Sequence, residues 1–261
     1  MSDGGREQPG RVYLVGSGPG DSSLLTVRAR DLILTCKHIV YDALIGRDVI
    51  GMIPADVKKY DAGKRRGRHR MEQEDINALL LKLALSGEDV VRLKGGDPFI
   101  FGRGAEEVEF LRARGIRVEI VPGVSSATAG PELAGIPLTK RGVSDRVLII
   151  SARGAGGSDI NWKGIFQDRQ TAVFLMGLSS ASEISTRLKE GGMPSDMPVA
   201  VIFGASLPGQ QTVITDLEGL KLVRQRGKLN LPALIVVGPA VSFRLNQEGE
   251  QAESGSTETG R

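Results

Sequence analysis

Short apolar runs alternate with amphipathic stretches along most of this 261-residue chain. Runs of apolar and β-branched residues are typical of buried strands, whereas apolar residues spaced three and four apart are typical of helices. The clearest helical pattern is Gln73–Leu85, in which Ile76 and Leu80 share one face. Gly87 follows this stretch, at a position where glycine favours the end of a helix.

The apolar runs predict strands at Val12–Val15, His38–Tyr41, Val90–Leu93, Val118–Val121, Val147–Ser151, Ala172–Leu175, Val199–Phe203 and Ala233–Val237. The amphipathic stretches between them predict helices at Leu24–Thr35, Gln73–Leu85, Gly104–Arg114, Ser125–Leu133, Ala181–Lys189 and Asp216–Arg224. Strands that alternate with helices in this way are typical of parallel sheets with helices on their faces. We therefore expect an α/β fold with largely parallel sheets.

A turn signal in the middle of the chain, Val121–Pro122–Gly123–Val124, predicts a domain boundary. We expect an N-terminal α/β domain over residues 11–121, a C-terminal α/β domain over residues 122–246, and an active-site cleft between them. The tail, residues 247–261, has no apolar periodicity and is expected to be disordered, as are residues 1–10.

Composition is that of an ordinary globular protein and excludes several functions. The chain is 40% hydrophobic and 25% charged. Aromatic residues make up only 4%, too few for the stacking platforms that bind single-stranded nucleic acid. Cys36, the only cysteine, excludes a cysteine-rich metal site, and no metal is expected. With no signal peptide and no long apolar span, we expect a cytoplasmic protein that does not contact a membrane.

The formal net charge of +3 hides an uneven distribution along the chain. Four Glu and one Arg give residues 247–261 a net charge of −3, which leaves +6 on residues 1–246. An excess this small favours an anionic small molecule over a nucleic acid as the binding partner.

The first motif, Gly16–Ser17–Gly18–Pro19–Gly20–Asp21, follows the first predicted strand and precedes a predicted helix. A glycine-rich turn there invites a dinucleotide-binding interpretation, with Asp42 at the end of the second strand as the ribose-binding acid. The spacing does not fit, because the third glycine of that fingerprint falls on Asp21, where the pyrophosphate must bind. Asp21 suits the cap of the helix instead, together with Ser22 or Ser23.

The most informative stretch is Val90–Gly104, in which an apolar strand leads into Gly95, Gly96 and Asp97. Glycines at the exit of a strand let the backbone approach a ligand closely, because they carry no Cβ atom. Asp97 could accept hydrogen bonds from a ribose or an amine, and Arg103 adds the opposite charge. The carboxylate tolerates a sulfonium cation and disfavours a phosphate. This stretch predicts a small-molecule site, although glycine pairs also occur in plain turns.

A basic run, Gly63–Lys64–Arg65–Arg66–Gly67–Arg68–His69–Arg70, lies in a glycine-containing loop. One interpretation is a solvated loop without a specific ligand. The other is a mobile lid in which Arg65, Arg66 and Arg68 recruit a polyanionic substrate, since arginine can hold a carboxylate with two parallel hydrogen bonds.

Two further motifs follow the predicted boundary, Val121–Pro122–Gly123–Val124–Ser125–Ser126 and Gly135–Ile136–Pro137–Leu138–Thr139–Lys140–Arg141–Gly142. Ser125 and Ser126 suit the cap of a helix and could equally contact a ligand at the domain junction.

Together these motifs resemble the uroporphyrinogen-III C-methyltransferases, a branch of the tetrapyrrole methylase family. The resemblance covers roughly Arg11 to Arg244. It rests on the segments VGSGPGD, VYDALI, GKRRGRH, RLKGGDPFIFGRG, VPGVSS, GIPLTKRG, VFLMGL and PALIVVG. The basic loop and the complete GGDPFIFGRG run favour this branch over later precorrin methylases and diphthine synthase.

The resemblance implies transfer of two methyl groups from S-adenosylmethionine to carbons C2 and C7 of uroporphyrinogen III. The products would be S-adenosylhomocysteine and precorrin-2, which leads to sirohaem and cobalamin. The resemblance also implies two α/β domains with the cofactor between them, no metal, and a homodimer. The eight carboxylates of the substrate would suit the basic loop.

The cofactor contacts of the family correspond here to Pro19, Gly95, Gly96, Asp97, Ile100, Ser125, Ser126, Met176, Ala205 and Gly238. Its substrate contacts correspond to Glu106, Arg141 and Met176, and its proposed catalytic base to Arg103. A guanidinium titrates only above about pH 12 and has no acceptor when charged. Arg103 therefore suits a substrate carboxylate, and water or another carboxylate would take the proton.

Three alternatives stay open at this point. Another precorrin C-methyltransferase of the same family would use the same site. An NAD-binding oxidoreductase would use the first glycine loop and Asp42, and a regulatory tetrapyrrole-binding protein would bind without turnover.

Overall fold

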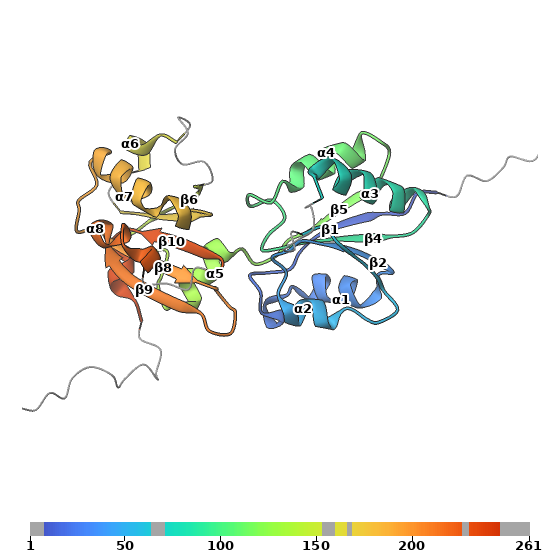
Figure 1. Ribbon diagram of the computed structural model, residues 1–261, viewed down its shortest axis with the longest axis horizontal. Helices are drawn as coiled ribbons and strands as arrows, with labels where there is room; N and C mark the ends of the chain where they lie inside the picture. The colour runs from blue at the N-terminus through green and yellow to red at the C-terminus, as the bar shows by residue number, and fades with distance from the viewer. Residues whose placement is uncertain (1–7, 64–70, 153–159, 166–168, 226–229, 246–261) are drawn as a thin grey trace, which may run out of the picture.

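The computed structural model describes residues 8–63, 71–152, 160–165, 169–225 and 230–245. Within them the chain forms two α/β domains that lie side by side, each built on a five-stranded sheet (Figure 1). The basic-loop residues Arg65, Arg66 and Arg68 lie outside the described residues, as do residues 1–7 and the acidic tail.

The first sheet has the strand order β3-β2-β4-β1-β5, and every neighbouring pair in it is parallel. Its strands are β1 (Val12–Gly16), β2 (His38–Tyr41), β3 (Lys58–Asp61), β4 (Val90–Lys94) and β5 (Val118–Val121). The helices are α1 (Val27–Thr35), α2 (Arg47–Met52), α3 (Gln73–Leu85) and α4 (Gly104–Arg112). Helices α1 and α2 pack on one face of the sheet, and α3 and α4 pack on the other (Figure 1). This is the covered parallel sheet that the alternating pattern predicts.

The second sheet has the order β6-β7-β10-β8-β9 and is mixed. Its strands are β6 (Arg146–Ser151), β7 (Gln170–Leu175), β8 (Pro198–Phe203), β9 (Gln211–Asp216) and β10 (Ala233–Val237). Strands β6 and β7 pair in parallel, whereas the β7–β10, β10–β8 and β8–β9 pairs are antiparallel. The expectation of largely parallel strands is therefore wrong for this sheet. The sequence pattern missed β9, which returns antiparallel to β8 and reverses the chain before β10.

Helices cover both faces of the second sheet as well. Helix α5 (Ser126–Leu133) packs on one face, and α6 (Trp162–Ile165), α7 (Ala181–Glu190) and α8 (Leu217–Leu220) pack on the other. Short 3-10 helices, η1 (Ser22–Leu24), η2 (Leu178–Ser180), η3 (Val223–Gln225) and η4 (Pro239–Phe243), complete the connections. No helix in the described ranges is long and apolar enough to cross a bilayer.

The two strands that the sequence pattern missed, β3 and β9, each lie at one edge of their sheet. Their sequences, Lys-Lys-Tyr-Asp and Gln-Thr-Val-Ile-Thr-Asp, carry charged or polar residues because an edge strand is partly solvated. Helix α1 begins later than predicted because Thr26 caps it, accepting a hydrogen bond from the backbone N–H of Ala29 at 3.3 Å.

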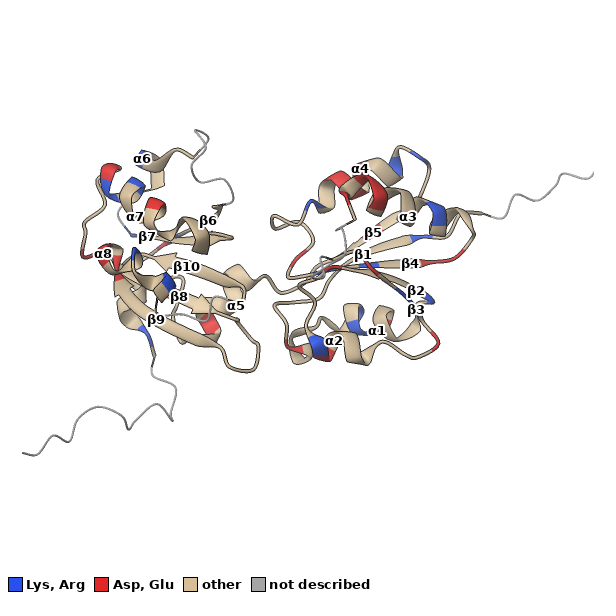
Figure 2. Cartoon of the chain, viewed as in Figure 1, with Lys and Arg blue, Asp and Glu red and all other residues tan. Residues whose placement is uncertain are grey.

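Strand β5 ends at Val121, and residues 122–125 carry the chain into α5, which packs on the second sheet. Residues 122–131 contain no charged side chain, so the segment that joins the domains is tan in Figure 2. A second contact between the domains joins the backbone N–H of Asp21 to the hydroxyl of Ser206, at 3.1 Å. The loop after β1 therefore meets the loop between β8 and β9.

Candidate active site

The first domain has a topological switch point between the neighbouring strands β1 and β4. The chain leaves β1 toward α1 on one face of the sheet and leaves β4 toward α4 on the opposite face. Diverging connections leave a crevice beyond the carboxyl ends of the two strands, and open α/β sheets bind ligands in such crevices. The stretches that border this crevice, Gly16–Asp21 and Gly95–Gly104, are the two that the sequence singles out.

Three glycines from different strands bring three backbones into contact at the crevice, and we call Gly16, Gly96 and Gly123 the glycine crossing. A Cβ atom added to Gly123 would stand 2.3 Å from the carbonyl oxygen of Gly96, and one added to Gly16 would stand 2.6 Å from the same oxygen. Gly18 and Gly96 exchange two backbone hydrogen bonds, of 3.2 and 2.8 Å. A side chain at Gly16 or Gly123 would therefore force the strand exits apart, whereas Gly96 has a φ angle of 68° that favours glycine.

Asp97 uses one carboxylate oxygen to hold the glycine crossing and the other to hold its own loop. Oδ2 accepts a hydrogen bond from the backbone N–H of Gly123 at 3.1 Å, and Oδ1 accepts one from Phe99 at 2.9 Å. Each carboxylate oxygen has a second lone pair, so a ligand can still donate to Asp97. Asp97 thus ties the β4 loop to the interdomain segment and stays a candidate cofactor contact.

We expect Asp97→Ala to lower the free energy of unfolding by about 2 kcal/mol, because two backbone N–H groups lose a charged acceptor. The variant should also bind S-adenosylhomocysteine more weakly. Asp97→Asn keeps one acceptor oxygen and should lose less in both respects. Urea denaturation and calorimetry measure the two effects, and an Asp97→Ala midpoint equal to that of the wild type would contradict this assignment.

Asp21 caps the 3-10 helix η1, whereas the helix that the sequence predicted it to cap, α1, is capped by Thr26. Its carboxylate accepts a hydrogen bond from the backbone N–H of Ser23 at 2.8 Å, and this bond lowers the pKa of Asp21. The preceding Pro19 and Gly20 pass close to the other domain, because a Cβ atom on Gly20 would stand 2.5 Å from Leu207. With Asp21 so engaged and η1 only three residues long, this turn gives the dinucleotide interpretation no support.

Left-handed backbone at non-glycine residues is concentrated where the two domains meet. Phe101, Arg103, Met176 and Ser206 have φ angles of 52°, 59°, 58° and 65°. Arg169, which precedes β7, is the remaining example among the described residues. Backbone of this kind is strained in residues with a side chain, and it clusters at functional sites. Two of the four, Arg103 and Met176, are predicted site residues.

Arg103 stands at the N-terminus of α4 and pairs with Glu106, one turn further on. Arg103 Nη2 donates to Glu106 Oε2 at 2.6 Å, and Nε donates to both carboxylate oxygens at 3.0 and 3.1 Å. This hydrogen bonding raises the pKa of Arg103 and lowers the pKa of Glu106. Arg103 is therefore held as a cation, which suits a role in binding an anionic group and argues against a role as base.

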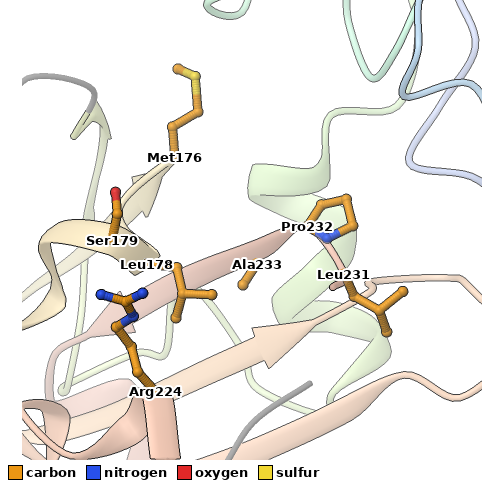
Figure 3. A pocket seen from close by; sticks show the side chains of 7 residues that line it. All are labelled: Met176, Leu178, Ser179, Arg224, Leu231, Pro232 and Ala233. Carbon is orange, nitrogen blue, oxygen red and sulfur yellow. The ribbon is translucent and has the colours of Figure 1, made fainter. Parts of the chain in front are cut away.

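The second domain contributes an open pocket of ≈ 320 Å³ at the edge where β7 ends and β10 begins. The residues that line it are Met176, Leu178, Ser179, Arg224, Leu231, Pro232 and Ala233. Figure 3 shows Met176 at one end of this pocket and Arg224 at the other. The predicted contact Ala205 lies at the same edge, because the neighbouring Gly204 donates its backbone N–H to the carbonyl of Pro232 at 2.7 Å.

The predicted cofactor contact Gly238 lies at the opposite end of β10 from the pocket. Strand β10 is antiparallel to β8, so its first residue, Ala233, lies opposite Phe203 at the end of β8. Gly238 follows β10 and donates its backbone N–H to the carbonyl of Pro198, where β8 begins, at 3.0 Å. It therefore lies about 17 Å along the strand from Ala233. The prediction of Gly238 came from the family resemblance, and we leave Gly238 out of the proposed site.

Ser125 and Ser126 open helix α5 beside the glycine crossing. The Ser125 hydroxyl caps the helix, accepting from the backbone N–H of Ala127 at 3.2 Å. The backbone nitrogen of Ser126 lies 4.0 Å from the place where a Cβ atom of Gly96 would stand. The start of α5 therefore borders the crevice with its backbone.

The remaining predicted residues lie in different surroundings. Gly95 leads into the β4 loop, and Ile100 further along it is 38% exposed. Arg141 is exposed in the turn between α5 and β6, in the second domain. The structure thus places the β4 loop residues together. Among the described residues, Arg141 makes no contact with them.

A buried charge cluster behind the crevice, made of Asp42, Arg92, Lys94 and Glu107, escaped prediction. Arg92 Nη2 donates to Asp42 Oδ1 at 2.6 Å and to Glu107 Oε1 at 3.1 Å, and Lys94 Nζ donates to Glu107 Oε1 at 3.1 Å. The available signal is the strand sequence Val-Val-Arg-Leu-Lys, because alternate positions of a strand share one face. Of the four residues, the sequence drew attention only to Asp42, as a ribose-binding acid.

These features define a class: an α/β protein with one parallel and one mixed sheet, and with a candidate small-molecule site at the crevice of the parallel sheet. Residues 11–221 match the family described as Tetrapyrrole (Corrin/Porphyrin) Methylases. The chain belongs to this family, which confirms the resemblance drawn from the sequence motifs.

Several curated proteins and solved structures are similar to this chain. A siroheme synthase from Escherichia coli O1:K1 is 41% identical over 235 residues, which are 90% of this chain and 51% of the relative. The chain thus spans about half the length of the curated relatives it matches. A uroporphyrin-III C-methyl transferase from Thermus thermophilus, solved with S-adenyl homocysteine, is 35% identical. That match covers 92% of this chain and 97% of the other, with a TM-score of 0.76. A cobalt precorrin-4 methyltransferase is 25% identical over 88% of this chain and 95% of its own, with a TM-score of 0.79.

The residues around the crevice fit S-adenosylmethionine. Asp97 keeps lone pairs for a ribose hydroxyl or for attraction to the sulfonium charge. Met176 and Ile100 are 42% and 38% exposed, and they offer apolar surface to an adenosine group. Among the described residues, no three His, Cys, Asp or Glu side chains are arranged to hold a metal ion.

Proposed function

We propose that this protein transfers two methyl groups from S-adenosylmethionine to carbons C2 and C7 of uroporphyrinogen III, which yields precorrin-2. The observation that carries the proposal is the 35% identity, over 92% of the chain, to a uroporphyrin-III C-methyl transferase complexed with S-adenyl homocysteine. The similarity to siroheme synthases supports a role in making sirohaem.

The reaction needs binding and orientation more than it needs a nucleophilic side chain. S-adenosylmethionine supplies a methyl group on a positively charged sulfur, which is already activated for displacement. The pyrrole carbon provides the electron pair of the new C–C bond, and the electrons of the broken S–C bond stay on sulfur. Holding the two reactants in line contributes a large share of such an acceleration. We assign this work to Gly95, Gly96, Asp97 and Met176.

After the transfer the tetrapyrrole carries a positive charge, and it must lose a proton from carbon to a base. We assign the role of base to Asp42 rather than to Arg103. Asp42 follows β2 at the carboxyl edge of the first sheet, where its backbone N–H donates to the carbonyl of Leu93 at 3.2 Å. Its side chain is 30% exposed, and Arg92 holds Oδ1. A held and partly exposed carboxylate beside the β4 loop is a suitable proton acceptor.

The substrate carboxylates need cationic partners, and Arg103 and Arg141 are our candidates for two of them. The basic loop supplies further candidates through its sequence. We expect replacement of Arg65, Arg66 and Arg68 by Gln to raise the KM for uroporphyrinogen III about tenfold, with little change in kcat, because charges at the rim mainly affect binding. Arg28→Gln with Arg30→Gln, on α1, is the matched control and should leave KM unchanged. An unaltered KM in the loop variant would leave that loop a solvated segment.

The test of the proposed function is turnover with a defined product. The full chain is incubated with uroporphyrinogen III and isotopically labelled S-adenosylmethionine, and the methyl groups added are counted by mass spectrometry. Two methyl groups per tetrapyrrole are expected. Binding without methyl transfer would instead indicate a regulatory tetrapyrrole-binding protein. Calorimetric titration with S-adenosylhomocysteine and with NADH separates a methyltransferase from an oxidoreductase.

A second candidate is a methyltransferase that acts on a later precorrin. The TM-score of 0.79 to a cobalt precorrin-4 methyltransferase favours it on geometry, although the identity there is only 25%. The same assay with precorrin substrates in place of uroporphyrinogen III decides between the two.

We also propose that the protein forms a homodimer, on the resemblance alone. Sedimentation of the purified chain tests this, and a monomer at all concentrations would contradict it.

A further inference from the structure

The buried charge cluster lies directly behind Asp42. Arg92 and Lys94 alternate along β4 and are 1% and 3% exposed, and Glu107 of α4 is fully buried. Arg92 links the two carboxylates of the cluster, at 2.6 Å from Asp42 and 3.1 Å from Glu107. Lys94 Nζ lies 3.1 Å from Glu107 and 3.9 Å from Asp42 Oδ2. Two cations and two anions therefore share one closed site.

Glu107 is the centre of this cluster. Its Oε1 accepts hydrogen bonds from Arg92, from Lys94 and from Gln73 of α3, while Oε2 is buried without a hydrogen-bond partner in the described structure. A buried polar atom without a partner destabilises a fold. Burial also lowers the pKa of Lys94, because an ammonium group loses its hydration there. The cluster therefore fills this space at a cost in folding free energy.

Stability does not explain such a cluster, because well-packed apolar side chains in place of buried ion pairs are often as stable or more so. Its single partly exposed member is Asp42, at the carboxyl edge of the sheet where the reactants would meet. Among the described residues, Arg92 and Lys94 lie next to Asp42, and Lys94 also lies next to the β4 loop, where its Cε atom would be 3.3 Å from a Cβ atom on Gly102. The geometry therefore connects three buried charges to one accessible carboxylate.

We propose that Arg92, Lys94 and Glu107 are positioning residues that hold the Asp42 carboxylate toward the crevice and set how readily it takes a proton. This inference rests on the proposed role of Asp42 as proton acceptor. Arg92 fixes Oδ1. Oδ2 is too far from Lys94, at 3.9 Å, for a hydrogen bond, so its lone pairs stay available to the substrate while the ammonium charge acts on it.

The signs of the surrounding charges give the inference a directional consequence. Arg92 and Lys94 face Asp42 from β4, Glu107 stands behind them on α4, and Asp61 ends the neighbouring strand β3. Without the Lys94 cation, the Asp42 carboxylate is less stabilised and picks up a proton at higher pH. Without the Glu107 anion, Arg92 and Lys94 no longer share their positive charge with a second carboxylate. They then stabilise the Asp42 carboxylate more, and it stays ionised to lower pH.

The experiment compares pH–rate profiles of the full-length wild type, Lys94→Met and Glu107→Gln. We expect the acidic limb of kcat to move up by about one pH unit in Lys94→Met and down by about one pH unit in Glu107→Gln, since one charge is removed within a few ångströms. Exposed Lys221 and Glu218 form an ion pair of 2.8 Å in the second domain. Lys221→Met and Glu218→Gln are therefore the matched controls and should move neither limb.

A merely structural cluster would lower the melting temperature and kcat in both variants without moving the limb in opposite directions, and that result overturns the inference. S-adenosylhomocysteine affinity within threefold of the wild type shows that each variant keeps a folded site. If a variant does not fold, Lys94→Gln and Glu107→Met provide the same charge changes with other shapes.

Carbon-13 NMR of the Asp42 carboxyl, assigned with Asp42→Asn, gives the same test without turnover. Opposite movements of its titration midpoint in the two variants support the inference even if uroporphyrinogen III is not methylated, in which case the proposed function alone fails. Midpoints that do not move apart overturn the inference even if the wild type is an active methyltransferase.

Discussion

Arg103→Leu is expected to reduce kcat/KM for uroporphyrinogen III by about 10²–10³-fold, while the affinity for S-adenosylhomocysteine stays within threefold of the wild type. The Arg103 guanidinium is half exposed at the N-terminus of α4, and Glu106 keeps it cationic. Loss of a charged contact to a bound anion costs about 2–5 kcal/mol, which corresponds to this range. Steady-state kinetics and calorimetry measure the two quantities separately.

Arg30→Leu is the matched control, because Arg30 also forms an exposed ion pair, with the adjacent Asp31, on α1. It should leave both quantities unchanged. A loss of S-adenosylhomocysteine affinity in Arg103→Leu would move Arg103 from the tetrapyrrole to the cofactor. Full activity in that variant would remove Arg103 from the site altogether.

Gly123→Ala is expected to lower the free energy of unfolding by about 3 kcal/mol and to abolish detectable binding of S-adenosylhomocysteine. The added methyl group would stand 2.3 Å from the carbonyl oxygen of Gly96 and 2.7 Å from the backbone of Gly16. Since backbone rather than a mobile side chain is in the way, the strand exits must separate, and overpacking of this kind destabilises by 1–3 kcal/mol or more. Urea denaturation and calorimetry give the two values.

The same substitution elsewhere in the first domain should have the opposite sign. Gly51 lies inside α2, where an added Cβ atom would meet nothing within 4 Å. Gly51→Ala should therefore stabilise the protein by up to about 1 kcal/mol, because alanine is the better helix former. If Gly123→Ala were as harmless as Gly51→Ala, the close approach of the three backbones would not be a requirement of the fold.

The sequence predicted the first domain better than the second, and the reason is physical. Strands β1, β2 and β4 are buried along their whole length, and most of their residues are apolar, so the hydrophobic pattern detects them. The edge strands β3 and β9 are partly solvated and carry no such pattern. Strand β9 forms a hairpin with β8, and β10 then pairs antiparallel to β8, a direction that the pattern of apolar runs does not reveal.

The site was predictable where backbone chemistry defines it. The glycines before Asp97 predicted a close approach of the backbone to a ligand, and the structure shows that Gly96 also lies close to the backbones of Gly16 and Gly123. Side-chain partnerships over long sequence distances were not predictable. Nothing local to Glu107 shows that it faces Lys94 from another element, and nothing local to Asp97 shows that Gly123 donates to it.

The glycine crossing also links the site to the order of folding. Its members lie at positions 16, 96 and 123, on strands that pair only when β1 has both β4 and β5 beside it. A chain that has not yet closed these long loops has strands and helices but no crevice, so the ligand recognises only the completed first sheet. Any ligand that binds there stabilises the completed sheet against partial unfolding in proportion to the logarithm of its concentration. Hydrogen exchange of the backbone amides in β5 should consequently slow when the site is occupied, although no side chain of β5 is assigned to the site.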